Sequence, residues 1–96
     1  MHVVWSQTAL DQLEAIADHV ARHSPTAAYD LADTVTERTS RLADNPLIGR
    51  GGRVAGTREL VLAGTAYIVV YEVGERVDVL AVMHGAREWP EDFRRP

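Results

Sequence analysis

The stretch that decides the fold is YIVVYEVGERVDVLAVMH, residues 67–84. Its two halves, residues 67–73 and 76–84, are rich in β-branched and aromatic residues, which favour strands. Both halves are apolar at odd and even positions, as is typical of strands in the middle of a sheet with both faces covered. Gly74 and Glu75 separate them, and glycine at the first of two turn residues predicts a two-residue hairpin. We therefore expect an antiparallel strand pair at the centre of a sheet.

Two helices are predicted upstream of this pair. Over residues 7–22 apolar residues recur every three or four positions, which indicates an amphipathic helix with Ser6 as its N-cap. Ser24 followed by Pro25 is a second start signal, because a capping serine often precedes a proline in the first turn. This second helix is expected to end near Asp44. The short connection between the two predicts an antiparallel helical hairpin.

The remaining segments complete a predicted β-α-α-β-β-β order. NPLIGRGGRVAG, residues 45–56, holds four glycines and a proline, so we expect a loop there. Residues 3–5 and 58–62 are the other extended candidates. A chain of 96 residues is the length of a single domain. The sequence therefore predicts one α+β domain over residues 1–96, with a helical hairpin packed on a mostly antiparallel sheet in two layers.

The composition narrows the classes of function. The chain has no cysteine and no lysine, so its ten basic residues are all arginines, and its net charge is −4. The negative charge argues against a general nucleic-acid binder. The histidines form no ligand set, so neither a metal nor another cofactor is expected. No apolar run approaches the about 20 residues of a membrane span, and the N-terminus does not resemble a signal peptide, so we expect a cytoplasmic protein without a membrane partner.

Three arginines, Arg50, Arg53 and Arg58, lie in and just after the glycine-rich loop of residues 45–56. Arginine forks beside exposed backbone N–H groups are suited to binding a phosphate or an acidic peptide. The loop is not a P-loop, since it lacks the lysine and the Ser/Thr that follows it. The competing interpretation is a solvated connector whose arginines maintain solubility.

A polar cluster follows the last predicted strand. Alternation places His84 on the same face as Leu80 and Val82, where it could act as a general acid or base. Arg87 could stabilise charge on a scissile phosphate. From these residues alone the more ordinary interpretation is favoured, namely a half-buried histidine and a surface arginine.

Three aromatic residues have two interpretations each. Trp89 is suited to stacking on a base or filling a partner's pocket, but a fold-back onto the core is the commoner role. Tyr67 and Tyr71 share one face of the predicted middle strand. They either belong to the core or line an open face of the sheet.

The chain as a whole resembles the RelE/ParE superfamily of bacterial type II toxins. VVWSQTALDQLEAIADHVA is similar to the family's first strand and helix, and ADNPLIGRGGRVAGTREL to its loop and second strand. YIVVYEV followed by VDVLAVMHGAREWP resembles its closing hairpin. The resemblance implies a small growth-inhibiting toxin, associated with plasmid stabilisation, that forms a hetero-oligomer with a cognate antitoxin. The ribonuclease branch cleaves mRNA on the ribosome without a metal, whereas ParE proper poisons DNA gyrase.

The residues favour the gyrase branch. Family ribonucleases often carry an arginine in a tyrosine-arginine-x-x-tyrosine pattern, and here that position is Ile68. The absence of lysine and the net negative charge also weaken the RNA interpretation. The alternative is a metal-independent endoribonuclease in which His84 transfers a proton while Arg58 and Arg87 hold the phosphate. Glu59 is a further candidate base, although alternation places Arg58 rather than Glu59 on the face of the neighbouring leucines. A third interpretation is an inert or purely regulatory subunit of a complex.

Overall fold

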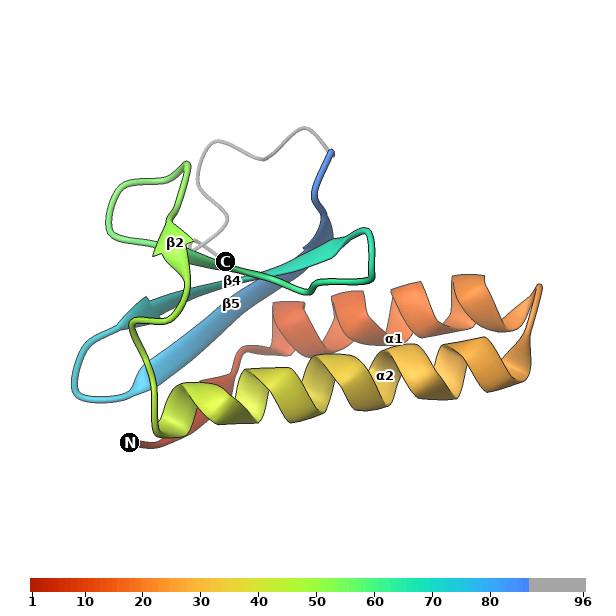
Figure 1. The fold of residues 1–96 in the computed structure, drawn as a ribbon, viewed down its shortest axis with the longest axis horizontal. Coiled ribbons are helices and arrows are strands. Elements are labelled where there is room, and N and C mark those ends of the chain that lie inside the picture. Colours follow the sequence, from red (N-terminus) through yellow and green to blue (C-terminus); the bar gives the residue numbers. More distant parts are fainter. Residues whose placement is uncertain (87–96) are drawn as a thin grey trace.

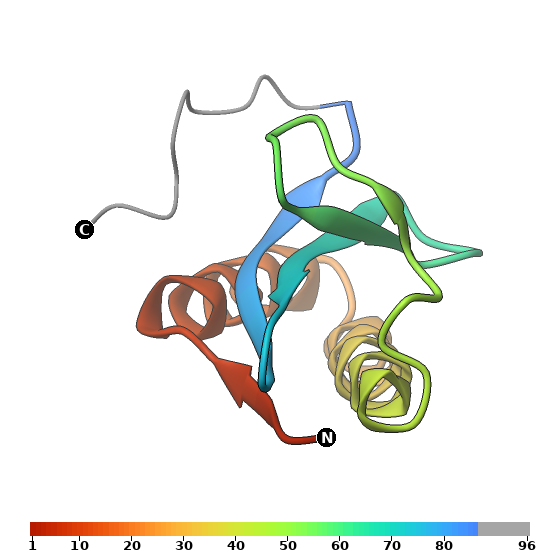
Figure 2. The same cartoon turned by 90° about the vertical axis from the view of Figure 1, so that its left-hand side faces the viewer.

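The computed structural model describes residues 1–86, so the expectations for Arg87 and Trp89 lie outside the described residues. The elements are β1 (Val3–Trp5), α1 (Gln7–Ala21), α2 (Pro25–Ser40) with a 3-10 turn (Arg41–Ala43), β2 (Arg50–Gly51), β3 (Arg58–Val61), β4 (Tyr67–Val73) and β5 (Val77–His84). Figure 1 shows the two helices side by side as an antiparallel hairpin, and Figure 2 shows that both cover the same face of the sheet. The predicted two-layer α+β arrangement is confirmed.

Both helices begin where the sequence predicts. The Oγ atom of Ser6 accepts a hydrogen bond from the N–H of Ala9 at 3.0 Å. The Oγ atom of Ser24 accepts one from the N–H of Ala27 at 3.2 Å, and Pro25 is the first residue of α2. Each serine thereby satisfies one of the backbone donors that a helix leaves free at its N-terminus.

The five strands lie in the order β1-β5-β4-β3-β2. β1 is parallel to β5 and the other pairs are antiparallel. The core between the sheet and the helices contains Ala9, Val35, Leu62, Val69, Val79 and Val82, and a second buried cluster on the opposite face contains Ile68, Val70, Ala81 and Met83. The central pair β4 and β5 is therefore buried on both faces, as its continuous apolar sequence predicts. Within residues 1–86, no helix is long and apolar enough to cross a membrane.

One strand lies where only a loop was expected. Arg50 and Gly51 form β2, pairing with Glu59 and Arg58 of β3 respectively. The sequence gives no strand signal here, because glycine and arginine have little preference for strands. The pairing comes from tertiary contacts that hold the glycine-rich loop against β3.

The predicted two-residue hairpin is wrong. Val73 pairs with Val77, so the connection between β4 and β5 has three residues, and the N–H of Gly74 bonds to the carbonyl of Arg76 at 2.9 Å. Gly74 does not have the positive φ that a glycine-first hairpin turn requires. The third turn residue, Arg76, removes the need for that conformation.

A β-bulge interrupts the alternation predicted for β5. Val70 pairs with Ala81 and Tyr71 with Val79, which leaves Leu80 as an extra residue. The carbonyl of Leu80 instead accepts a hydrogen bond from the hydroxyl of Ser6 at 3.3 Å. As a result Val79, rather than Leu80, packs with Val82 in the core that faces the helices.

Candidate functional site

The glycine-rich loop is fixed to the core by Tyr71, which is fully buried. Its hydroxyl donates to the carbonyl of Pro46 at 2.8 Å and accepts from the N–H of Gly49 at 2.9 Å. A Cβ atom on Gly49 would lie 2.5 Å from that hydroxyl and 2.9 Å from the carbonyl of Glu59, so the close approach requires glycine. The structure thus places Tyr71 in the core, the first of its two predicted roles.

We expect Tyr71→Phe to lower the free energy of unfolding by about 1–3 kcal/mol, because the buried N–H of Gly49 loses its acceptor. Burial raises the pKa of the Tyr71 phenol above its ordinary value of 10.0, against the opposing effects of the Gly49 N–H and the Arg58 charge. Folding therefore favours the neutral phenol. Its contribution to the free energy of unfolding is fully present below pH 10.0 and is lost as the pH rises through the folded-state pKa.

Urea unfolding of the natural sequence and Tyr71→Phe at pH 8 and above pH 10 measures both effects. The largely exposed Tyr29 provides the matched control, Tyr29→Phe. A Tyr71→Phe protein as stable as the natural one at pH 8 would contradict the role of the hydroxyl.

Arg58 fastens the same loop from the helix-facing side of the sheet. Its Nη1 atom donates to the carbonyl of Gly49 at 2.8 Å and to that of Leu47 at 3.3 Å. Arg58 and Leu60 face the helices, whereas Glu59 faces the other way, as alternation predicts. Arg58 therefore uses donors of its guanidinium group to hold the loop.

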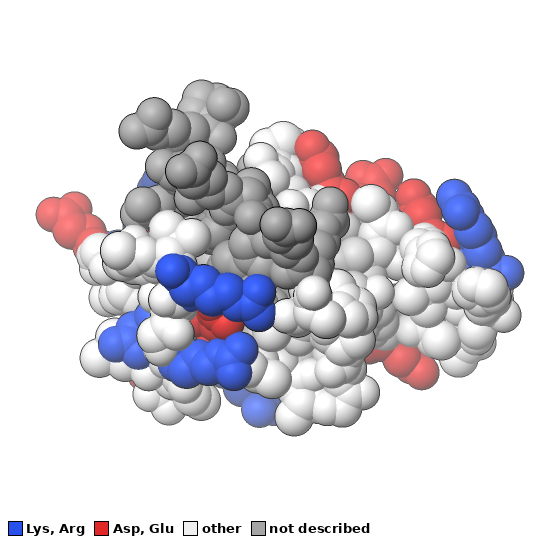
Figure 3. Space-filling view, turned by 90° about the horizontal axis from the view of Figure 1, so that it is seen from above, with Lys and Arg blue, Asp and Glu red and all other residues white. Residues whose placement is uncertain are grey.

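Glu59 holds the loop from the opposite face of the sheet, and its side chain is 1% exposed. Its carboxylate accepts hydrogen bonds from Nη2 of Arg50 at 3.0 Å and from the backbone N–H of Arg53 at 2.9 Å. The Nη2 atom of Arg53 donates to the carbonyl of Gly85 at 2.7 Å. Figure 3 shows the arginine side chains grouped around a carboxylate at this end of the molecule. The cluster joins the glycine-rich loop to the end of β5.

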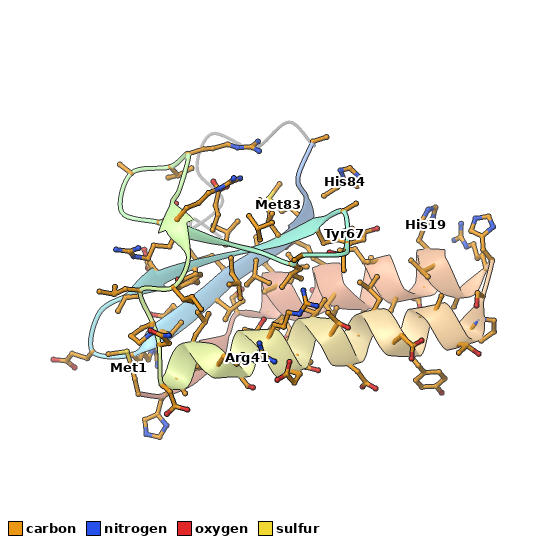
Figure 4. The ribbon with its side chains drawn as sticks, viewed as in Figure 1. Met1, His19, Arg41, Tyr67, Met83 and His84 are labelled. Carbon is orange, nitrogen blue, oxygen red and sulfur yellow. The ribbon has the colours of Figure 1, made fainter. Side chains whose placement is uncertain are left out.

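His84 lies at the end of β5 beside Tyr67, with the two rings edge to face and their centroids 5.7 Å apart. Its Nδ1 atom accepts a hydrogen bond from the N–H of Ala86 at 3.2 Å, so the neutral ring carries its proton on Nε2. A pocket of about 260 Å³ at this point is lined by Gln12, Ala15, Ile16, His19, Tyr67, Val82, Met83 and His84. Figure 4 shows His84 and Tyr67 together at this end of the sheet, with His19 on α1.

The structure does not bring Arg58 and His84 together. Arg58 of β3 pairs with Tyr71 and His84 of β5 pairs with Tyr67, so one strand, β4, lies between the two residues and they are four positions apart along it. At the usual strand spacings this is about 13 Å along the strands and about 10 Å across them. The guanidinium group of Arg58 also binds the carbonyl of Gly49, in the loop beside β3 and so away from β5. Arg53, in contrast, reaches the end of β5.

The helical hairpin extends past one end of the sheet (Figure 1), and hollows between α1, α2 and the ends of β4 and β5 form a notch there. Tyr67 lies in this notch and lines two hollows, the pocket beside His84 and a second hollow of about 400 Å³. The second hollow is lined by Val20, Ala27, Asp30, Leu31, Thr34, Gly64, Thr65, Ala66 and Tyr67. Tyr67 is thus accessible to a partner, whereas Tyr71 on the same face of β4 is not.

The described residues contain no group of three or more side chains suited to holding a metal ion. His19 and His23 lie near each other at the end of α1, with ring centroids 6.0 Å apart. His84 stands beside Tyr67 and its pocket. Of the histidines, His19 and His84 line the pocket beside Tyr67.

Sequence reasoning left the role of Glu59 open. A glutamate between Arg58 and Leu60 in a short strand is usually taken as a solvent-facing residue. The available signal was the neighbouring strand, in which Ile68 and Val70 occupy the same face as Glu59 and are apolar. A carboxylate beside such residues is buried and needs partners, which the loop arginines supply.

Comparison with known proteins defines the class of this fold and site. The family model described as ParE toxin of type II toxin-antitoxin system, parDE, matches residues 3–89. The putative toxin Y4kP of Sinorhizobium fredii is 37% identical over 87 residues, covering 91% of each chain. Toxin RelE2 of Caulobacter vibrioides is 35% identical over 85 residues, covering 88% of this chain and 96% of the relative.

A solved structure supports the same class. A chain of the chromosomal ParDE TA system from P. aeruginosa superposes with a TM-score of 0.78 and 27% identity, covering 88% of this chain and 95% of that one. The fold is that of RelE/ParE toxins, which confirms the resemblance read from the sequence. The chain belongs to the ParE toxin family of type II toxin–antitoxin systems, and a cognate antitoxin is its family's partner.

Proposed function

We propose that this toxin arrests bacterial growth by poisoning DNA gyrase when it is free of its antitoxin. The observation that carries the proposal is that Arg58 and His84 lie on opposite sides of β4 and four positions apart along it. A ribonuclease built on these residues needs the phosphate-holding arginine within contact of the proton donor. A gyrase poison needs a binding surface and no proton transfer. The proposal places the toxin in the cytoplasm, where gyrase acts.

The apolar character of the sheet's outer face supports the same choice. Ile68, at the position where family ribonucleases often carry an arginine, is buried in a cluster with Val70, Ala81 and Met83. This cluster offers no donor to a scissile phosphate. The neighbouring carboxylate, Glu59, is already bound to the loop, so it is poorly placed to act as a base.

The alternative is a ribosome-dependent mRNA endoribonuclease, and one observation favours it. His84 borders a pocket with Tyr67, and Arg53 reaches the adjoining Gly85. A histidine beside a cavity is suited to proton transfer near neutral pH. In this alternative Arg53, rather than Arg58, would be the arginine next to the reacting phosphate.

We further propose that the cognate antitoxin docks a helical or extended segment on the helical hairpin and the sheet edges, including the notch beside Tyr67, and that its acidic residues pair with Arg50, Arg53 or Arg58. Apolar side chains of Ile16, Val20 and Leu31 border the two hollows in the notch. Such a groove is suited to an amphipathic helix or to an added strand.

Cells that produce the toxin distinguish the two targets. A gyrase poison is expected to leave chromosomal breaks and to induce a DNA-damage reporter before translation falls. A ribonuclease is expected to cut mRNA at fixed codon positions without breaks in DNA. Codon-positioned cuts that precede any DNA damage would contradict the proposal.

His84→Ala is expected to retain growth arrest, with a change nearer ~1 kcal/mol in binding or folding, as for ordinary single substitutions. Loss of a general acid in a ribonuclease would instead lower cleavage by roughly 10²–10⁴-fold. His19→Ala in the same pocket is the matched control. Arg87→Ala and Trp89→Ala are expected to weaken arrest more, since arginine and tryptophan anchors concentrate binding energy.

Growth arrest is measured for each variant, with circular dichroism to verify folding. A folded His84→Ala protein without toxicity, together with a toxic Trp89→Ala protein, would overturn the gyrase proposal and indicate catalysis.

A further inference from the structure

Two histidines lie side by side where the first helix ends. His19 is in the last turn of α1, and His23 follows four residues later, in the turn that leads into α2. Residues four apart share one face of a helix. Their rings are arranged edge to face, with centroids 6.0 Å apart. The structure thus brings two imidazoles together, although the spacing of the four histidines in the sequence predicted no ligand set.

Hydrogen bonds fix the backbone that carries this pair. The N–H of His23 bonds to the carbonyl of Val20 at 3.0 Å, and the N–H of Ser24 bonds to the same carbonyl at 3.0 Å. The hydroxyl of Ser24 in turn caps α2. His23 is therefore held between the end of one helix and the start of the next. The spacing of the two histidines is set before any ligand binds, which lowers the cost of binding.

Both imidazoles are open to an outside ligand. The side chains of His19 and His23 are exposed, and within residues 1–86 neither ring has a hydrogen bond or an ion pair. His84 differs, because its Nδ1 atom accepts a hydrogen bond from Ala86. A neutral imidazole has one nitrogen with a free lone pair, and that nitrogen is the commonest metal ligand in proteins.

The spacing of the rings suits a shared metal ion. Two imidazoles on one tetrahedral zinc, with Zn–N bonds of about 2.0–2.1 Å, have their ring centroids about 5 Å apart. The present spacing of 6.0 Å is therefore about 1 Å too long. Exposed side chains rotate readily, so rotation of His19 and His23 can close this difference.

The surroundings favour one class of metal. Imidazole nitrogen suits zinc, nickel and copper, whereas magnesium and calcium require oxygen ligands. The carbonyl end of a helix also carries a partial negative charge, which attracts a cation. Within residues 1–86 no third histidine or carboxylate completes a ligand set, so water or an outside ligand takes the other positions. His19 also lines the pocket beside Tyr67, so these open positions adjoin the notch (Figure 4).

We propose that His19 and His23 form a chelating site for one divalent transition-metal ion of the zinc class. Each imidazole contributes one ring nitrogen, and water completes the coordination. The ion joins the last turn of α1 to the turn before α2, so it stabilises this end of the helical hairpin. The site depends neither on the gyrase proposal nor on where the antitoxin docks.

Calorimetric titration of the full chain, without a polyhistidine tag, with zinc tests the site. We expect one zinc ion per chain, and binding that is weaker by roughly 100-fold or more in His19→Ala and in His23→Ala, because the second ligand of a chelate binds at a high effective concentration. His2→Ala and His84→Ala should bind zinc as the natural protein does. The matched control Arg22→Ala changes the residue just before His23 and removes a nearby positive charge, so it should not weaken binding.

Thermal unfolding gives a second measurement. Saturating zinc should raise the melting temperature of the natural protein by about 5 °C or more, and should leave that of His19→Ala unchanged. Acidification to about pH 5 should abolish binding, because protons compete with zinc for the imidazole nitrogens. Zinc binding of natural strength in either His19→Ala or His23→Ala would overturn the proposal. So would a natural protein that millimolar zinc neither binds nor stabilises. Circular dichroism verifies that each variant is folded.

Discussion

Replacing Glu59 by alanine is expected to lower the free energy of unfolding by about 3 kcal/mol. Hydrogen bonds to charged groups contribute roughly 1.5–3 kcal/mol, and this carboxylate accepts them from both Arg50 and the backbone of Arg53. The guanidinium groups remain partly in solvent, so the loss should not exceed the roughly 3–5 kcal/mol seen when a fully buried pair is broken. For a domain of this length the melting temperature should fall by on the order of 10 °C or more.

Thermal and urea unfolding of Glu59→Ala measure this loss, with Glu75→Ala in the exposed β4–β5 turn as the matched control. Glu59→Leu should lose less stability than Glu59→Ala, because an apolar side chain fills the space beside Val70. A Glu59→Ala protein as stable as the Glu75→Ala control would show that the loop is held without the carboxylate.

Production of this chain without its antitoxin is expected to stop bacterial growth, and coproduction of the antitoxin is expected to restore it. The expectation follows from the family model, which matches residues 3–89, and from the ParDE structure, which covers 88% of this chain. Viable counts after induction provide the measurement. We expect the rescue because an antitoxin bound to the folded toxin would keep the toxin from its cellular target.

The control for growth arrest is Val79→Asp, which places a charge at a fully buried position and should unfold the protein. Arrest by this variant would indicate a general burden of overproduction. Normal growth in the presence of abundant, folded natural protein would contradict the assignment as an active toxin.

Local sequence signals predicted most of the fold. The capping serines Ser6 and Ser24 determine where the helices begin, and each acts within its own turn. The central strands β4 and β5 were recognisable because burial on both faces imposes a continuous apolar sequence. Signals of this kind depend on neighbours in the sequence, so they can be read without the tertiary structure.

Features that depend on distant contacts were not predictable in the same way. The strand at Arg50 exists because the Glu59 carboxylate and the Tyr71 hydroxyl hold the loop against β3. The bulge at Leu80 follows from the contact of β5 with Ser6 at the start of α1. Likewise, the separation of Arg58 from His84 follows from the register of β3 and β5 on β4. The sequence alone does not reveal this register.

Incubation of the purified toxin with DNA gyrase and supercoiled DNA tests the central claim most directly, with translating ribosomes and mRNA in parallel. The account predicts that detergent and protease treatment of the gyrase reaction releases linear DNA in proportion to toxin, and that prior binding of the antitoxin prevents this. His84→Ala should release linear DNA as the natural toxin does. Intact DNA at every toxin concentration, together with codon-positioned cuts in the mRNA that His84→Ala abolishes, would contradict it.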